Sequence, residues 1–426
     1  MTALQFLFSL ERLGMKFGLE NMRALCAALD HPESAFRSVI VAGTNGKGSV
    51  SAMLSKALHA GGYRVGRYTS PHLERIEERF VIGEEAVDSG ELERAAAVVR
   101  ETVERLLADG TLAAPPTFFE CATAIGFELF RRAGVTIAVV EVGLGGRLDA
   151  TNVLTPVAAA ITTIGLDHQE LLGDTLPAIA REKAGVIKPG ITVVVGRLPS
   201  AALDVVAAEA DRHGARLVRA TEAVDAALIL DRGVRTMLLR TRRTELVGVL
   251  PALAGRHQIE NAAVALCVME ALGEAGFELT PAAMRAGFER VRWPGRLERV
   301  SWRGAEIVLD AAHNPDGAQS LAAYLEDEGW TGVTLVIGVM ADKDVRGIVA
   351  ALMRFARVIV CTTPPSPRAM PAATLAALVG ESAAAGTRIE AIDDPAAALD
   401  HACLDGARVV AAGSIFLLGP LRGILR

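Results

Sequence analysis

The sequence predicts an α/β protein with a larger domain, built on a mostly parallel sheet, and a smaller α/β domain after it. Short β-branched runs alternate with segments of helical periodicity that are rich in Ala, Leu, Glu and Arg. Continuous apolar runs such as VTIAVVEV at 135–142 are typical of strands buried on both faces. The chain has 426 residues, 51% of them apolar. At roughly 150 residues per domain, this length favours two or three domains, each with its own core.

The alternation starts at the first apolar run and continues to about residue 224. Extended apolar runs predict strands at 39–42, 65–68, 135–142, 157–164 and 192–195. Segments with apolar residues three or four positions apart predict helices at 47–60, 89–108 and 117–132. Successive strand–helix–strand units imply parallel strands with helices on both faces of the sheet.

The pattern then changes, and the alternation restarts after a linker. Residues 225–251 predict a small antiparallel insert with a turn at Gly233, and a helix begins near Arg256. No periodic run crosses Trp293-Pro294-Gly295, which predicts domains at 1–294 and 295–426. In the second domain we expect strands at 307–309, 334–337, 358–361 and 409–411, and helices from 316, 345 and 373.

Composition and charge exclude several classes of protein. With 44 Lys and Arg against 50 Asp and Glu, the net charge of −6 does not provide the basic surface that nonspecific nucleic-acid binding needs. The five cysteines are scattered among apolar neighbours without a CxxC pair, so we expect free core thiols. The N-terminus has no secretory pattern, and no run of about 18 apolar residues occurs. We therefore expect a cytoplasmic protein with no membrane or nucleic-acid partner.

A glycine-rich loop, GTNGKGS at 43–49, lies between a predicted strand and a predicted helix. Backbone N–H groups at a helix N-terminus bind anions, and glycines let the backbone approach a phosphate closely. Lys47 adds positive charge for the β- and γ-phosphates, and the Ser49 hydroxyl is placed to bind Mg²⁺. The loop is shorter than GxxxxGK[ST], and Gly48 separates the lysine from the serine. An ordinary glycine-rich turn is the alternative, but the strand–loop–helix context favours phosphate binding.

Two polar residues lie at the sheet edge where ligands bind in open α/β folds. Glu141 ends the run VTIAVVEV and can face a magnesium ion held against the phosphates, although alone it could be a charge in solvent. His168 follows the next apolar run, but imidazole is an unusual ligand for Mg²⁺ and a lone histidine is more often structural. Lys183 is equally ambiguous, because most lysines on helices point to water.

Seven sequence strings occur in an order that resembles one family. They are VAGTNGKGS, YTSPHL, EVGLGGRLDATN, LDHQELLGDTLPAIAREKAGVIKPG, GRHQIENAAVA, WPGRLE and LDAAHNPDGA, and the resemblance extends from about Leu10 to Ser414. Together they resemble the folylpolyglutamate synthase/dihydrofolate synthase branch of the Mur ligase superfamily. The resemblance implies a P-loop central domain of the Mur ligase type with a mostly parallel sheet, and a smaller Rossmann-like α/β C-terminal domain.

The resemblance also implies a role for each matching residue. ATP would be bound by Asn45, Gly46, Lys47, Gly48, Ser49, Asn261, Arg296 and Asp310. Two magnesium sites would use Ser49, Ser70, Glu141, His168 and Lys183, with the lysine carbamylated so that it presents a carboxylate. The pterin pocket would be lined by Thr117, Phe118, Phe119, Glu120, Leu148, Asp149 and Ala150, with His313 and Ser414 on the glutamate side. The catalytic residues would be Lys47, Lys183 and His313.

The implied activity is ATP-dependent ligation of L-glutamate to dihydropteroate, to the γ-carboxyl group of folylpolyglutamates, or to both, through an acyl phosphate. The expected partners are small molecules (pteroate or folate, glutamate, ATP), and the expected state is a monomer. We favour the bifunctional form over an enzyme with either single activity. A cell-wall Mur ligase is the first alternative. It would need an additional N-terminal nucleotide-binding domain, and the loop that begins at Gly43 leaves no room for one. A P-loop NTPase switch gives no reason for the second α/β domain.

Overall fold

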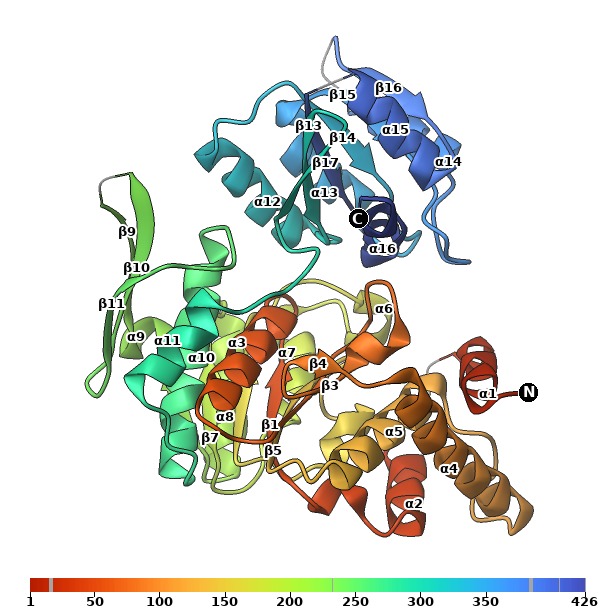
Figure 1. Ribbon diagram of the computed structural model, residues 1–426, viewed down its shortest axis with the longest axis vertical. Coiled ribbons are helices and arrows are strands. Elements are labelled where there is room, and N and C mark those ends of the chain that lie inside the picture. Colours follow the sequence, from red (N-terminus) through yellow and green to blue (C-terminus); the bar gives the residue numbers. More distant parts are fainter. Residues whose placement is uncertain (15–17, 232, 383–385, 406, 426) are drawn as a thin grey trace. The chain divides into compact units, whose positions relative to one another are not determined.

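The computed structural model describes residues 1–14, 18–231, 233–382, 386–405 and 407–425 (Figure 1). The chain forms two compact units, one of Met1–Pro251 with Glu260–Val291 and one of Ala252–Ile259 with Arg292–Arg426. The second unit thus begins three residues before the predicted boundary. It also includes a short segment, 252–259, that the sequence analysis had placed in the first domain.

The first unit contains an eight-stranded sheet in the order β4-β3-β2-β5-β1-β6-β7-β8. Its strands are β1 (Arg37–Ala42), β2 (Val65–Tyr68), β3 (Phe80–Ile82), β4 (Glu85–Ala86), β5 (Ile137–Glu141), β6 (Ala158–Ile161), β7 (Thr192–Val195) and β8 (Arg216–Arg219). Six neighbouring strands pair in parallel, in the order β2-β5-β1-β6-β7-β8. Strands β3 and β4 add an antiparallel edge beside β2. The predicted parallel sheet is confirmed. The strand predicted at 157–164 is shorter and ends at Ile161.

Helices cover both faces of this sheet. They are α1 (Ala3–Ser9), α2 (Glu20–Ala28), α3 (Lys47–Ala60), α4 (Ser89–Ala108), α5 (Phe118–Arg132), α6 (Gln169–Leu172), α7 (Leu176–Ala184), α8 (Ser200–Arg212), α9 (Ala220–Ala223), α10 (His257–Glu274) and α11 (Pro281–Glu289). Alternate strand residues such as Ile40 and Val140 join a core with α2, α4, α5, α7 and α8. Helix α3 packs on β1, β2 and β5, and α11 packs on α3.

The predicted antiparallel insert is also confirmed. It consists of β9 (Asp225–Asp231), β10 (Val234–Arg240) and β11 (Glu245–Val249), in the order β11-β10-β9. Gly233 has a φ of +81° in the turn between β9 and β10, a conformation that glycine adopts without strain. Helix α11 contacts β11 and so attaches the insert to the first unit.

The second unit is a six-stranded sheet in the order β12-β13-β17-β14-β15-β16. Its elements are β12 (Glu298–Trp302), β13 (Ala305–Asp310), α12 (Pro315–Asp327), β14 (Val333–Ile337), α13 (Val345–Leu352), β15 (Ala356–Cys361), α14 (Ala372–Gly380), β16 (Arg388–Ala391), α15 (Pro395–Asp405), β17 (Arg408–Ala412) and α16 (Ile415–Ile424). All strands pair in parallel except β12, which forms a hairpin with β13. The predicted α/β character is confirmed.

All five cysteines are free, and four of them are buried. Within the described ranges, no helix is long and apolar enough to cross a membrane.

Candidate active site

The glycine-rich loop at 43–49 joins β1 to α3, as the sequence predicts. Two of its glycines are required by the geometry, because Gly43 and Gly46 have φ values of +145° and +88°. A Cβ atom on Gly43 would lie 2.0 Å from Thr162 Oγ1, and one on Gly46 would lie 2.4 Å from Asn261 Oδ1. The loop therefore lies against the end of β6 and against Asn261 on α10, a residue expected to contact ATP.

The chain that follows β6 holds the loop in place. The hydroxyl groups of Thr162 and Thr163 donate to the carbonyl oxygen of Asn45 at 2.6 and 3.1 Å. The Thr44 hydroxyl donates to the carbonyl oxygen of Gly165 at 3.3 Å and accepts the Gly165 N–H at 3.0 Å. Sequence reasoning missed Thr162 and Thr163 because it placed them inside the strand predicted at 157–164. Their position, directly after an apolar run at the ligand-binding edge, is the signal that could have identified them.

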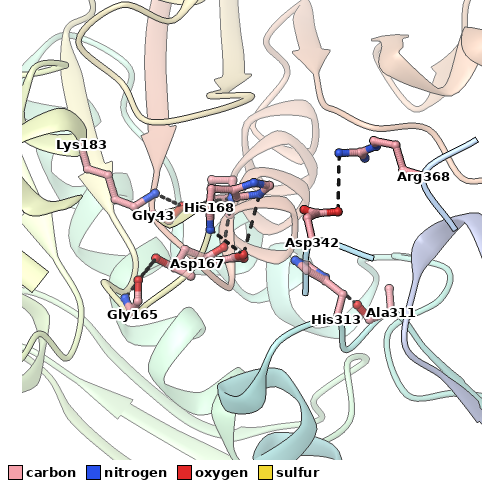
Figure 2. Close-up of polar contacts among 11 residues, drawn as sticks. Gly43, Gly165, Asp167, His168, Lys183, Ala311, His313, Asp342 and Arg368 are labelled. Atoms are coloured by element: carbon pink, nitrogen blue, oxygen red, sulfur yellow. Dashed lines mark hydrogen bonds and ion pairs between the residues drawn. The ribbon is translucent and has the colours of Figure 1, made fainter. Parts of the chain in front are cut away.

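Two lysine side chains meet at one carbonyl group of the loop. Lys183 Nζ donates to the carbonyl oxygen of Gly43 at 2.9 Å (Figure 2), and Lys47 Nζ donates to the same oxygen at 3.0 Å. Burial, and then the positive charge of Lys47, lower the pKa of Lys183 to about 7, against the attraction of Asp167 and Asp149. Lys183 is therefore an amine that loses its proton near neutral pH.

Glu141 lies beside Ser70 at the same sheet edge. Glu141 ends β5, which pairs with both β1 and β2, and Ser70 follows β2. The Ser70 N–H donates to Glu141 Oε2 at 3.2 Å, and the glutamate side chain is buried. Ser49, in the first turn of α3, is buried as well. Carboxylate and hydroxyl oxygens of this kind are suitable ligands for Mg²⁺.

His168 is brought to this edge by the segment after β6. It has a φ of +51° and precedes α6, and its Nε2 lies 3.9 Å from Asp167 Oδ1 (Figure 2). Asp167 was not a predicted site residue, although its charge acts on Lys183. Across the described ranges, no three His, Cys, Asp or Glu side chains form a cluster that could hold a metal ion. The predicted magnesium set contributes only Glu141 and His168 of these types, so it is not such a cluster.

The segment expected to line the pterin pocket begins with a capped helix. Thr117 is the N-cap of α5 rather than its first residue, as the sequence analysis had placed it. Glu120 Oε2 accepts the backbone N–H and the hydroxyl of Thr117 at 2.7 and 3.0 Å, and Asn21 Nδ2 donates to the same oxygen at 3.4 Å. The buried Glu120 carboxylate thus fixes the start of the helix, and its placement orients the two phenylalanines that follow Thr117.

Asp149 has a similar structural use in the second pterin segment. Its Oδ2 accepts the Leu144 N–H at 2.9 Å, and its Oδ1 accepts the N–H and hydroxyl of Thr151 at 3.0 and 2.6 Å. Burial raises the pKa of Asp149, against these hydrogen bonds. Its neighbours Leu148 and Ala150 are half-buried and buried, respectively. The carboxylate closes the loop that follows β5 into a fixed shape.

Phe119 of the first pterin segment packs against the loop after β5 that leads to the second pterin segment. A Cβ atom on Gly143, just after β5, would lie 2.5 Å from the Phe119 ring. The same ring is 6.1 Å from that of Tyr68, centroid to centroid. Phe118 is half-buried and lies 5.9 Å from the ring of Phe8 on α1. The rings of Tyr68, Phe118 and Phe119 therefore form an aromatic region of the first unit, beside the loop that leads to residues 148–150.

In the second unit, three predicted residues follow adjacent strands. Asp310 ends β13, Ser414 follows the paired strand β17, and His313 lies between β13 and α12. His313 Nδ1 is 2.9 Å from the carbonyl oxygen of Ala311 (Figure 2), so this nitrogen carries the proton and donates it to the carbonyl group. Ser414 is the buried N-cap of α16 and accepts the N–H of Phe416 at 3.1 Å.

Asp310 also braces the chain that enters the second unit. Its two carboxylate oxygens accept the N–H groups of Leu297 and Ala312 at 2.9 and 3.0 Å. Burial raises the pKa of Asp310, and the nearby Arg296 guanidinium opposes this shift. Arg296 itself donates to the carbonyl oxygen of Gly295 at 3.1 Å. The expected ATP contact of Asp310 is therefore combined with a structural task.

Apart from the pterin segments described above, the predicted residues thus form two groups, each within one unit. Residues 45–49, Ser70, Glu141, His168, Lys183 and Asn261 gather at one edge of the first unit, and Arg296, Asp310, His313 and Ser414 gather in the second.

Two family models match the chain. The Mur ligase middle domain matches residues 113–269, and the Mur ligase glutamate ligase domain matches residues 295–415. The folylpolyglutamate synthase of Lacticaseibacillus casei is 37% identical over 380 residues, covering 88% of this chain and 87% of that protein. The dihydrofolate synthase/folylpolyglutamate synthase of Mycobacterium tuberculosis is 38% identical over 383 residues, covering 85% of this chain and 77% of that protein.

Solved structures agree with these relatives. Folylpolyglutamate synthase of M. tuberculosis, solved with ADP and AMPPCP, has a TM-score of 0.92 at 33% identity and covers 99% of this chain and 98% of its own. FolC of Escherichia coli, solved with DHPP and ADP, has a TM-score of 0.87 at 29% identity and covers 100% of this chain and 97% of its own. The chain belongs to the folylpolyglutamate synthase/dihydrofolate synthase family of Mur-type ATP-dependent ligases.

Proposed function

We propose that this protein ligates L-glutamate to dihydropteroate and to the γ-carboxyl group of folylpolyglutamates, using ATP and an acyl phosphate intermediate. The observation that carries the proposal is the meeting of the glycine-rich loop, the Glu141–Ser70 pair and Lys183 at one sheet edge. The relatives support it, because their names include folylpolyglutamate synthase alone and combined with dihydrofolate synthase. We place the enzyme in the cytoplasm as a monomer.

The reaction needs activation because a carboxylate is a poor acylating agent. A carboxylate oxygen of the acid attacks the γ-phosphorus of ATP, which forms an acyl phosphate and releases ADP. The glutamate amine then attacks the carbonyl carbon, and phosphate leaves with the electrons of the broken C–O bond while the nitrogen loses its proton. Phosphoryl transfer depends chiefly on alignment and on neutralisation of charge, so no residue has to form a covalent intermediate.

The glycine-rich loop would hold the phosphates of ATP. Its backbone N–H groups lie at the N-terminus of α3, where the helix dipole favours negative charge. The Lys47 ammonium donates to the carbonyl oxygens of Gly43 and Thr44 at 3.0 and 3.1 Å. When ATP binds, phosphate oxygens would replace these carbonyl oxygens as acceptors. Asn261, which lies against Gly46, would contact the nucleotide from α10.

The residues at this edge fit magnesium, since Ser49, Ser70 and Glu141 supply the oxygen atoms that the ion prefers. His168 would add a nitrogen ligand. The ion would neutralise negative charge on the phosphates. The buried Glu141 carboxylate is the strongest single element of the set, because it places a negative charge beside the loop that would hold the nucleotide.

Lys183 would join this set after reaction with carbon dioxide. Its neutral amine attacks the carbon of CO₂, an N–C bond forms, and the nitrogen releases a proton, which leaves a carbamate. The neutral amine is thereby replaced by an anion beside Lys47. The pKa of about 7 makes the required neutral amine abundant at physiological pH, and the short distance between Lys183 and Gly43 places the group at the loop.

The second unit would bind the incoming glutamate. The Nδ1–H of His313 donates to the Ala311 carbonyl group, which leaves Nε2 as the acceptor nitrogen of the imidazole. This nitrogen can receive a hydrogen bond from the glutamate amine, and Ser414 lies at the end of the neighbouring strand. Asp310 and Arg296 would contribute ATP contacts from the same unit.

The test is release of ADP with dihydropteroate or tetrahydrofolate, each with and without glutamate. We expect release only when glutamate and a pterin acid are both present, with activity on both acids. Release that does not need glutamate would support an NTPase switch instead, and no turnover with either acid would contradict the proposal. Lys47→Ala should lower kcat at least about 100-fold. The matched control is Lys56→Ala, since Lys56 is on the same helix and pairs with Glu84 on the protein surface.

A further inference from the structure

Arg79 is a buried cation that the reaction described above does not use. It ends the short 3-10 helix η3 (Ile76–Arg79), just before β3, and is only 8% exposed. Burial lowers the pKa of its guanidinium, which reflects the cost of holding the charge away from water. Arginine nonetheless stays protonated in proteins, so the charge itself is retained.

The groups that contact this guanidinium are neutral. Arg79 Nε donates to His72 Nδ1 at 2.9 Å, which requires that nitrogen to be an unprotonated acceptor and the imidazole to be neutral. The Phe118 ring lies 5.0 Å from the guanidinium carbon, in a cation–π contact. The Tyr68 hydroxyl is a further hydrogen-bonding neighbour, and burial raises the pKa of Tyr68 to about 12, so it too is uncharged.

No carboxylate in the described part of the chain forms an ion pair with Arg79. Glu11 and Glu141 attract its charge through space, but they act from beyond contact distance. A buried charge is ordinarily paired, because an unpaired one destabilises the fold. Arg79 therefore resembles a ligand-binding cation, one that forms an ion pair only when an anionic ligand is bound.

The position of Arg79 indicates which anion it would bind. Its carbonyl oxygen accepts the N–H of Thr69 at 3.1 Å, next to Ser70, whose own N–H donates to Glu141. On its other side it contacts Phe118, in the segment expected to bind the pterin. The residue thus lies between the aromatic region and the metal-binding edge. An acid substrate could place its ring in the aromatic region and its carboxyl group near Ser70 and Glu141. Its carboxyl group would then lie beside the Arg79 guanidinium.

We propose that Arg79 binds the carboxylate of the acid substrate and positions it for attack on the γ-phosphorus of ATP. This inference rests on the proposed function. The planar guanidinium can donate two parallel N–H bonds to a carboxylate, which fixes the orientation of the group as well as its position. His72 and Phe118 hold the guanidinium without neutralising it. The residue would therefore distinguish a carboxylate from an uncharged group of the same shape.

The experiment compares the binding of dihydropteroate with that of its primary carboxamide, by calorimetry in the presence of ADP and magnesium. The wild-type protein should bind the acid at least about 30-fold more tightly than the amide. In Arg79→Met this ratio should fall to about threefold or less, and in Arg79→Lys it should be intermediate, because the lysine keeps the charge but loses the planar fork. The matched control is Arg75→Met at the N-cap of the same short helix, where the exposed Arg75 pairs with Glu77 at 3.4 Å. It should keep the wild-type ratio.

A stability measurement separates this role from a structural one. Because Arg79 has no charged partner, Arg79→Met should melt no more than about 3 °C below the wild-type protein. A wild-type ratio in a folded Arg79→Met protein would overturn the inference. If Arg79→Met fails to fold, a wild-type ratio in Arg79→Lys would overturn it instead. Turnover is measured separately, so a wild-type protein that binds the acid through Arg79 but does not ligate glutamate would contradict only the proposed function.

Discussion

At the scale of single residues, Lys183 couples the stability of the fold to pH. Burial and Lys47 lower its folded pKa to about 7, whereas a lysine in the unfolded chain has a pKa of about 10.4. Between these values the unfolded chain binds more protons than the folded protein, so stability should rise as pH increases from 7 to 10. The contribution of this residue over that window is on the order of 4 kcal/mol.

The corresponding variant is Lys183→Met, studied by denaturant unfolding at pH 7 and pH 10 in buffer free of carbon dioxide. Other groups titrate in the same range, so the quantity to compare is the pH-dependent gain in unfolding free energy of each protein. The wild-type gain should exceed that of the variant by several kcal/mol. Equal gains in the two proteins would show that burial does not lower the pKa of the Lys183 amine.

Catalysis provides a second test of the same residue. If Lys183 acts as a carbamate, Lys183→Ala should lower kcat by at least about 100-fold, because a negative charge is lost beside the phosphates. Acetate or formate should restore part of the activity by occupying the vacated volume. Lys188→Ala is the matched control, since Lys188 lies five positions on and donates to the carbonyl oxygen of Asn152 at 3.2 Å. A variant at Lys183 with normal turnover would exclude the carbamate role.

Single residues also show where sequence reasoning reached its limit. The glycine-rich loop and Glu141 stood out in the sequence as candidates because each lies at the end of a predicted strand. The structural uses of Glu120 and Asp149 were not predicted, because the sequence analysis assigned both residues only to the pterin pocket, whereas each carboxylate accepts backbone N–H groups within five positions. Arg79 could not be found at all, since its significance depends on what it contacts in three dimensions rather than on its neighbours in sequence.

At the scale of elements, the glycine-rich loop at 43–49 has no room for side chains at particular positions. Gly46 and Gly62 have nearly equal φ values of +88° and +87°, so alanine should cost about 1 kcal/mol of stability at either site. Only at Gly46 would the new Cβ atom lie 2.4 Å from Asn261 Oδ1; at Gly62 it would meet nothing within 4 Å. Gly46→Ala should therefore weaken ATP binding at least about tenfold by displacing Asn261. Gly62→Ala should leave it unchanged.

Calorimetric titration with ATP and magnesium measures this difference directly, and urea unfolding measures the shared effect on stability. Equal affinities in the two variants would mean that the loop tolerates a displaced Asn261 and that close packing is not what shapes the site.

The elements themselves were predicted with uneven success, for physical reasons. The helices at 47–60 and 89–108 and the strands at 65–68 and 192–195 have the predicted bounds, because their periodicity is continuous. The edge strands β4 and β8 were missed. Their sequences, EA and RLVR, are too short or too polar to stand out, and they become strands only by pairing with neighbours.

At the scale of the whole molecule, the division into two α/β units was predictable because Pro294 and Gly295 interrupt the periodic pattern. The assignment of residues 252–259 to the second unit could not be predicted from the sequence. It depends on tertiary contacts, among them the bond from Arg256 Nε to Asp327 Oδ2 at 2.7 Å and the close approach of Gly255 to Leu297. Contacts between residues so distant in sequence leave no local pattern.

The central claim for the whole molecule is that the acid is phosphorylated on its carboxyl group before glutamate attacks. The most direct test uses dihydropteroate with both carboxylate oxygens replaced by ¹⁸O, together with ATP and glutamate. The phosphate released should contain one ¹⁸O atom per molecule, because the C–O bond breaks when the amine displaces phosphate. Phosphate without the label, formed in step with the amide product, would contradict the acyl phosphate and the account built on it.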